Sequence, residues 1–238
     1  MKHLTTFTCA LILMAAMTGS ATAEETSRTM AMEFRLGTYL PDIDSEFSGD
    51  VKPFDTVFGN ESAWTYGLEV DAQFWQKFGS LGIFGITSYG YLDGKGIESG
   101  SGTASSDETT LSVLPLVGGV VYRFDVLAVK WNIPFVFTFK GGLDYTVWWI
   151  RDGVEDISDP DGLAQGYGGT FGLFGAAGLH LLLDVFEPHT AKVFDNDLGV
   201  NNSYLFLEYA YYWVNDFGSD SSFDLSHGGL FFGLAFEM

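Results

Sequence analysis

The stretch Phe135-Val-Phe-Thr-Phe-Lys140-Gly-Gly-Leu-Asp144-Tyr-Thr-Val-Trp-Trp149 alternates apolar and polar side chains along most of its length. A repeat of two places the aromatic and aliphatic residues on one face of a β-strand and Thr138, Lys140, Asp144 and Thr146 on the other. An ordinary globular strand has about 5–6 residues, whereas a tilted strand that crosses a bilayer needs about 9–11. The stretch is therefore long enough to span a membrane as a strand with one apolar and one polar face.

The same alternation recurs in Ala63–Trp75, where Trp64 and Tyr66 share one face and Glu69 and Asp71 the other. Pro115 is expected near the end of its strand or at a bulge, because proline has no N–H to donate. Both faces of Leu81–Leu92 are apolar, so its register stays open. The other predicted strands are Met30–Leu40, Leu81–Leu92, Thr109–Phe124, Tyr167–Leu183, Tyr204–Trp213 and Gly228–Met238. The sequence thus predicts an all-β fold, an antiparallel up-and-down transmembrane β-barrel of eight strands.

The amino terminus has the pattern of a cleaved secretory signal peptide. Lys2 precedes an apolar stretch from Leu4 to Met17, and Ala21-Thr22-Ala23 forms a small-residue cleavage site. We expect a signal peptide at residues 1–23 and one barrel domain at residues 24–238. The single cysteine lies in the signal, so the mature domain is expected to lack disulfides and thiolate metal sites.

The composition and charge of the chain exclude some partners and some classes of protein. The chain has 11 Lys and Arg against 31 Asp and Glu, a formal charge of −20. Nucleic acid and anionic membrane surfaces are therefore poor partners. Because 47% of the residues are hydrophobic and 16% aromatic, the chain does not belong to the acidic disordered class. No apolar run after the signal reaches the roughly 18 residues of a spanning helix, so the bilayer would be crossed by strands.

The connections predict the orientation of the barrel, since outer-membrane barrels have short periplasmic turns and longer outer loops. The segments 76–79, 125–133 and 184–202 are predicted on the periplasmic side, the last with a helical cap at Pro188 and His189–Asp195. Residues 41–62, 93–108, 151–166 and 215–227 are predicted to form the outer loops. Aromatic residues near the strand ends, such as Trp148 and Trp149, fit the interfacial belts of such barrels.

The carboxyl end, Gly233-Leu-Ala-Phe236-Glu-Met238, is similar to the terminal strand by which bacterial outer-membrane barrels are recognised and closed. Those strands usually finish on Phe or Trp, whereas this chain has Met238. The resemblance implies a location in the bacterial outer membrane, with outer-membrane lipid and the barrel-assembly machinery as partners. Gly233, Phe236 and Met238 are the residues of this predicted assembly signal.

Several stretches resemble a family of outer-membrane β-barrel proteins known mainly from myxobacteria and related groups. The resemblance covers nearly the whole mature chain, and it implies architecture and location but no activity. The stretches are Glu33-Phe-Arg-Leu-Gly-Thr-Tyr-Leu-Pro-Asp-Ile-Asp44, Val57-Phe-Gly59, Leu68-Glu69, Glu108-Thr-Thr-Leu111, Val121-Tyr-Arg-Phe-Asp-Val-Leu127, Val147-Trp-Trp-Ile-Arg-Asp-Gly153, Leu198-Gly-Val-Asn201 and Tyr204-Leu-Phe.

If the apolar faces meet lipid, the opposite faces bring charged residues into the barrel interior. Eight strands enclose a space that side chains fill, so a structural charge network is favoured over a pore lining, with a narrow gated path as the alternative. Arg35, Arg123 and Lys140 are predicted to be its hubs, because each can satisfy several buried carboxylates. The predicted members are Glu33, Arg35, Glu69, Asp71, Arg123, Lys140, Asp144 and Glu208, with Glu237 also on this face.

Two acidic groups in the predicted outer loops are candidates for Ca²⁺, which prefers carboxylate oxygens. One consists of Asp42, Asp44 and Glu46, and the other of Asp156, Asp159 and Asp161. The alternative is a solvated acidic surface in which the Asp side chains bond local backbone amides. No other cofactor is predicted.

The mature chain contains His180, His189 and His227, so a hydrolase deserves consideration. Ser226 and His227 are adjacent at the start of the last predicted strand, where neighbours point to opposite faces, and no nucleophile, zincin or phosphate-loop motif occurs. We therefore predict a non-enzymatic outer-membrane barrel with a structural or surface-interaction role. The alternatives are a cation-preferring channel for small solutes and a periplasmic lipocalin-like binder of apolar ligands.

Overall fold

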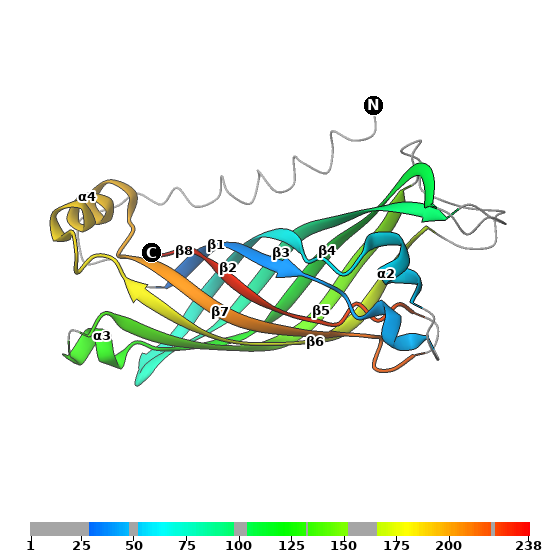
Figure 1. The fold of residues 1–238 in the computed structure, drawn as a ribbon. Coiled ribbons are helices and arrows are strands. Elements are labelled where there is room, and N and C mark those ends of the chain that lie inside the picture. The colour runs from blue at the N-terminus through cyan, green and yellow to red at the C-terminus, as the bar shows by residue number, and fades with distance from the viewer. Residues whose placement is uncertain (1–28, 48–51, 98–103, 132, 152–165, 220–221) are drawn as a thin grey trace, which may run out of the picture.

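The structure is a computed structural model that describes residues 29–47, 52–97, 104–131, 133–151, 166–219 and 222–238. Within these ranges the chain forms eight antiparallel strands, each paired with the next, and β1 pairs with β8 to close the barrel (Figure 1). This confirms the predicted up-and-down barrel. The predicted signal peptide and the group Asp156, Asp159 and Asp161 lie outside the described residues. The strands are β1 Met30–Tyr39, β2 Ala63–Lys77, β3 Gly79–Ile97, β4 Ala104–Phe124, β5 Phe135–Arg151, β6 Tyr167–Leu182, β7 Asn202–Val214 and β8 His227–Glu237.

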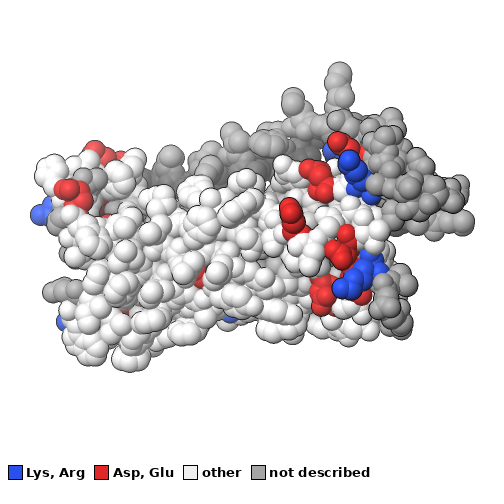
Figure 2. All heavy atoms as spheres, viewed as in Figure 1, with Lys and Arg blue, Asp and Glu red and all other residues white. Residues whose placement is uncertain are grey.

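The alternation predicted from the sequence sets the inner and outer faces of the wall. On β5, Phe139 and Leu143 are 52% and 62% exposed, whereas Lys140 and Asp144 are 6% and 1% exposed. The face of the barrel wall seen in Figure 2 has almost no charged residues, and charged side chains gather at its two ends. The aromatic side chains of β2 and β5 thus face outward, opposite to the arrangement that a lipocalin-like binder requires.

The structure also assigns the register of β3, which the sequence left open. Phe84 and Ile86 point into the barrel and are buried, while Ile83 and Tyr89 lie on the outer face. Tertiary packing decides between the two faces because both are apolar. The inward side chains meet other apolar groups, for example Phe174, whose ring centroid lies 5.8 Å from that of Phe84.

The expectation for Pro115 is wrong. Pro115 lies in the middle of β4, opposite Thr146 of β5, and the register with β5 runs through it without a shift. On the other side, the pairing of β4 with β3 stops at Thr87 and resumes at Gly90. Since proline has no N–H, the ladder to β3 is interrupted locally while the ladder to β5 is retained.

Short helices lie in some of the connections at both ends of the barrel. At the end that holds the carboxyl terminus, α3 (Val126–Trp131) joins β4 to β5, and α4 (Pro188–Leu198) joins β6 to β7 (Figure 1). The helix predicted after Pro188 is confirmed. The opposite end has the 3-10 helix η1 (Ile43–Glu46) and α2 (Pro53–Phe58). No helix in the described ranges is long and apolar enough to cross a membrane.

Candidate functional site in the barrel interior

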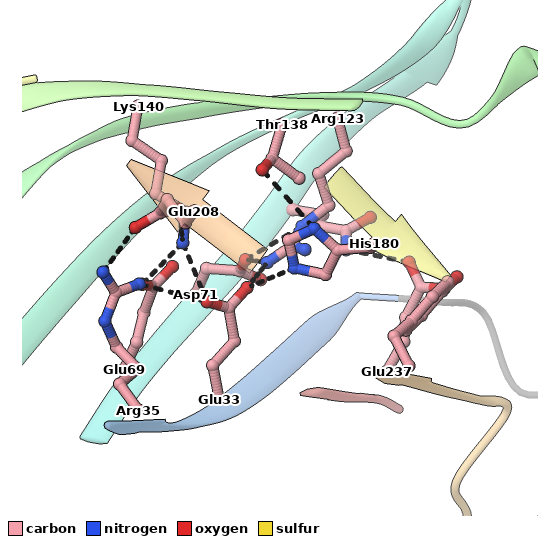
Figure 3. A network of polar contacts seen from close by, with 12 residues as sticks. Glu33, Arg35, Glu69, Asp71, Arg123, Thr138, Lys140, His180, Glu208 and Glu237 are labelled. Atoms are coloured by element: carbon pink, nitrogen blue, oxygen red, sulfur yellow. Dashed lines mark hydrogen bonds and ion pairs between the residues drawn. The ribbon is translucent and has the colours of Figure 1, made fainter. Parts of the chain in front are cut away.

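The interior contains a layer of buried charged side chains, which we call the interior ion-pair network (Figure 3). Its members are Glu33 and Arg35 of β1, Glu69 and Asp71 of β2, Arg123 of β4, Lys140 of β5, His180 of β6 and Glu208 of β7. Residues two apart on one strand share a face, so both members of each pair on β1 and β2 point inward. Seven of the eight residues predicted for the network are in it.

Lys140 resolves an unfavourable juxtaposition of charge. Glu33 and Glu69 are directly opposite each other in the β1–β2 ladder, where two like charges repel. The Lys140 ammonium lies 2.8 Å from a Glu33 oxygen, 2.7 Å from a Glu69 oxygen and 2.9 Å from a Glu208 oxygen. All four side chains are inaccessible to solvent. One cation from β5 therefore joins carboxylates of β1, β2 and β7.

Arg35 contacts the same three carboxylates as Lys140. Its guanidinium donates to Glu69 at 2.6 Å and to Glu33 at 3.3 Å, and its other terminal nitrogen donates to Glu208. The guanidinium also lies over the rings of Phe206 and Phe231, 5.8 and 5.2 Å from their centroids. Planar guanidinium groups suit such combined hydrogen bonding and stacking, so lysine would not replace Arg35 fully.

Arg123 forms the second part of the network. It donates through two nitrogens to Asp71, and one of these nitrogens lies 2.9 Å from Glu33. Glu33 thus contacts Arg35, Arg123 and Lys140, and it is fully buried. The three cations predicted as hubs each contact at least two carboxylates. They supply the opposite charge without which a buried carboxylate is costly.

His180 belongs to the network, although the sequence did not predict it there. Its Nε2 lies 3.2 Å from Glu33, its Nδ1 lies 3.5 Å from the Thr138 hydroxyl, and its ring stacks on Phe206. The available signal was its position as a single polar residue between Leu179 and Leu181. This pattern alone does not predict that His180 of β6 points inward and reaches Glu33 of β1 across the barrel.

Asp144 is a correction to the prediction, because it lies in the interior but outside the network. Its carboxylate accepts a hydrogen bond from Thr146 at 2.7 Å, and its other oxygen has no partner in the described part of the chain. Asp144 lies four positions after Lys140 along β5, so it is nearer to the end with α2. Glu237 is also separate, to one side in Figure 3, where it contacts Gln73, Asn202 and Tyr204.

Replacement of a carboxylate by an amide is expected to change the free energy of unfolding in opposite directions at Glu69 and at Asp144. Glu69→Gln removes a charge that two cations need, so we expect a loss of about 3 kcal/mol in the free energy of unfolding. Asp144→Asn removes a buried charge that has no cation, so we expect a gain on the order of 1 kcal/mol. The measurement is urea unfolding at neutral pH in lipid vesicles, followed by the mobility difference between heated and unheated samples on gels. Destabilisation by both variants to the same extent would contradict this assignment.

The carboxylates of the network are already in contact with protein cations. Glu33, Glu69 and Asp71 are the one group of metal-ligating type, among the described residues, whose oxygens lie within 4.8 Å of one another. Each of these three carboxylates is in contact with at least one of the cations Arg35, Arg123 and Lys140, so we place no metal there.

The predicted calcium ligands lie at the opposite end from the carboxyl terminus, around η1. Both oxygens of Asp44 accept hydrogen bonds from backbone amides at the start of α2, from Phe54 at 2.8 Å and from Asp55 at 2.9 Å. Asp42 and Glu46 are exposed. A calcium ion at Asp42, Asp44 and Glu46 stays a prediction, and Asp44 has a role as a cap of α2.

The histidines of the enzyme hypothesis are separated in the structure. His180 is in the network, His189 is exposed on α4, and His227 begins β8. The Ser226 hydroxyl accepts from the amide of Val214, and Nδ1 of His227 lies 3.2 Å from the carbonyl of Leu225. Within the described residues, no serine and histidine form the hydrogen-bonded pair that nucleophilic catalysis needs.

Comparison with known proteins places the fold. No protein-family model matches the sequence, and no curated protein matches it. The outer membrane protein OprG from Pseudomonas aeruginosa has a similar structure, with a TM-score of 0.51 and 14% identity over 89% of this chain and 96% of OprG. The structure of Ail of Yersinia pestis was solved with the heparin analogue sucrose octasulfate. It aligns with a TM-score of 0.43 and 12% sequence identity over 88% of this chain and 97% of Ail. The outer membrane enzyme PagL aligns with a TM-score of 0.38 and 12% sequence identity over 87% of this chain and 98% of PagL.

The class of protein follows from the barrel and from the likeness to OprG. The chain has the fold of an eight-stranded outer-membrane β-barrel. Its apolar outer wall and its charged interior are the reverse of a soluble globular protein, and they agree with that class.

Proposed function

We propose that this chain is an integral outer-membrane β-barrel protein without enzymatic activity, which does not conduct solutes and acts as a structural or surface-interaction component of the envelope. The observation that carries the proposal is the interior ion-pair network. Side chains from six strands meet there with little or no exposure to solvent. Such a network holds the wall together, and its buried side chains occupy the barrel interior at that level.

The apolar layers next to the network support the same conclusion. Phe206 and Phe231 lie against Arg35, and Phe84, Val117 and Phe174 fill the interior further along the barrel. Barrels of eight strands have an interior just wide enough for side chains. A hydrated pathway would require displacement of both the apolar side chains and the ion pairs.

Insertion in the outer membrane is supported by the outer face of the wall. Large apolar side chains on β5, β6 and β8 are exposed, among them Leu143, Phe171 and Leu230. Exposed patches of this extent are unfavourable in water and suit a lipid environment. The proposal of outer-membrane insertion also includes three predictions from the sequence. They are the secretory signal, the resemblance to the myxobacterial family, and the assembly role of Gly233, Phe236 and Met238.

We expect the purified protein in a planar lipid bilayer to produce no stable conductance steps, because the network and the apolar layers occupy the interior. A small-solute channel would instead give ohmic steps with cation preference, as the acidic interior implies. Insertion must be verified in the same preparation by the gel mobility shift between boiled and unboiled samples. Reproducible cation-selective conductance from folded protein would favour the channel alternative and reject this proposal.

A further inference from the structure

A pocket of about 320 Å³ lies at the end of the barrel that holds η1 and α2. It is formed where the segment after β1 folds over the start of β8. Its wall includes the apolar side chains of Leu40 and Phe54 and the polar side chains of Asp42, Asp55 and His227. Its volume is at the lower end of the range of small-molecule sites.

The lining of the pocket carries more negative than positive charge. Asp42, Asp44 and Asp55 line it, against Lys52 as the one basic side chain among its lining residues. Partial loss of hydration at the protein surface and the nearby carboxylates of Asp224 and Asp44 raise the pKa of the exposed Asp42 above its usual value. Asp42 therefore has carboxylates as its charged neighbours, and a cation in the pocket would relieve their repulsion.

His227 provides a second and independent indication of a ligand. The residue is 6% exposed and lines the pocket. Its Nδ1 lies 3.2 Å from the Leu225 carbonyl, which can only accept, so Nδ1 is the donor and Nε2 of the neutral ring is an acceptor. Within the described part of the chain, Nε2 has no hydrogen-bond partner. The rings of Tyr39 and Tyr212, at 4.5 and 4.4 Å, hold the imidazole in place.

These features fit an organic cation better than a metal ion. Both oxygens of Asp44 are occupied by amides of α2, and a neutral imidazole is a poor ligand for Ca²⁺, which prefers oxygen. The pocket is also far larger than an ion and is partly apolar. An alkylammonium group supplies N–H donors for the carboxylates and for Nε2, while its methylene chain contacts Leu40 and Phe54.

We propose that this pocket binds a small alkylammonium ligand, with the ammonium group between the carboxylates and His227. The proposal goes beyond the envelope role and does not depend on conductance. The carboxylates of Asp42 and Asp55 form its charged contacts, and His227 fixes the position of one N–H donor.

The test is isothermal titration calorimetry of the folded full chain in nonionic detergent, with putrescine (1,4-diaminobutane) as the probe and 1,4-butanediol as its neutral analogue. We expect putrescine to bind and butanediol not to bind. Loss of one charge-assisted hydrogen bond weakens binding about tenfold, so we expect that effect from Asp42→Asn. The matched control is Asp197→Asn, which removes an exposed charge from α4 at the other end of the barrel and should leave the affinity unchanged.

His227→Phe separates the two parts of the proposal. Phenylalanine keeps a ring between Tyr39 and Tyr212 but lacks Nε2, so putrescine affinity should fall while the gel mobility shift of the folded barrel is retained. If His227→Phe does not fold, the Asp42→Asn and Asp197→Asn comparison still decides. Equal binding of butanediol, no heat from putrescine at millimolar concentration, an equal loss in Asp197→Asn, or preferential binding of Ca²⁺ would each overturn the proposal.

Discussion

Lys140→Met is expected to lower the free energy of unfolding by about 3–5 kcal/mol, since removal of one partner leaves buried charge uncompensated. Methionine has nearly the shape of lysine, so the change removes charge with little change in volume. It leaves Glu33 and Glu69 opposite each other with Arg35 as the remaining cation between them. The measurement is urea unfolding in lipid vesicles, read from the fraction of protein that migrates as the folded band on unheated gels.

Two variants make this result specific to the network. Lys77→Met removes the same group from an exposed position on β2, where we expect less than about 0.5 kcal/mol of change. Glu69→Gln in the Lys140→Met background removes one of the uncompensated carboxylates and should restore part of the loss. If Lys140→Met unfolds at the same urea concentration as the unsubstituted protein, the network does not stabilise the barrel.

Gly233→Ala is expected to destabilise the pairing of β1 with β8. An added Cβ would lie 1.8 Å from the carbonyl oxygen of Phe34 and 3.1 Å from the Phe206 ring. The oxygen belongs to the backbone of β1, so relief requires a shift of one strand where the barrel closes. Overpacking of this kind costs about 1–3 kcal/mol, and we expect a smaller folded fraction after refolding into vesicles.

The control for Gly233→Ala is Gly85→Ala on β3. A Cβ at Gly85 would lie 3.8 Å from its nearest neighbour, the carbonyl oxygen of Val117, which is an ordinary contact. Both variants lose the same backbone freedom, so a difference between them reports the close approach at the β1–β8 pairing. An equal folded fraction for Gly233→Ala and the unsubstituted chain would show that β8 tolerates a side chain there.

The barrel class follows from local patterns in the sequence. A repeat of two depends on neighbouring residues only, so alternation of apolar and polar side chains predicts each strand and its lipid face, as on β5. The number of such segments and the short connections between them then favour consecutive antiparallel pairing. The helix after Pro188 was also predictable, because it begins with a residue suited to the first turn of a helix.

Other features depend on how the wall closes. Arg35 meets Glu208, and His180 meets Glu33, across the interior of the ring. The tilt and stagger of the strands decide which inward residues share a level, and no local pattern encodes them. For this reason Asp144, predicted in the network, lies beyond it, and His180, on an otherwise apolar stretch, lies within it.

The sequence by itself determined that this protein is an eight-stranded barrel with charged residues inside, because the alternation that separates apolar from charged side chains is a property of short segments. Tertiary structure alone decided which charges pair, which face of β3 is inward, and how Pro115 is accommodated within β4. It also brought Asp42, Asp55 and His227 to one pocket, because the segment after β1 and the start of β8 meet only once the barrel has closed.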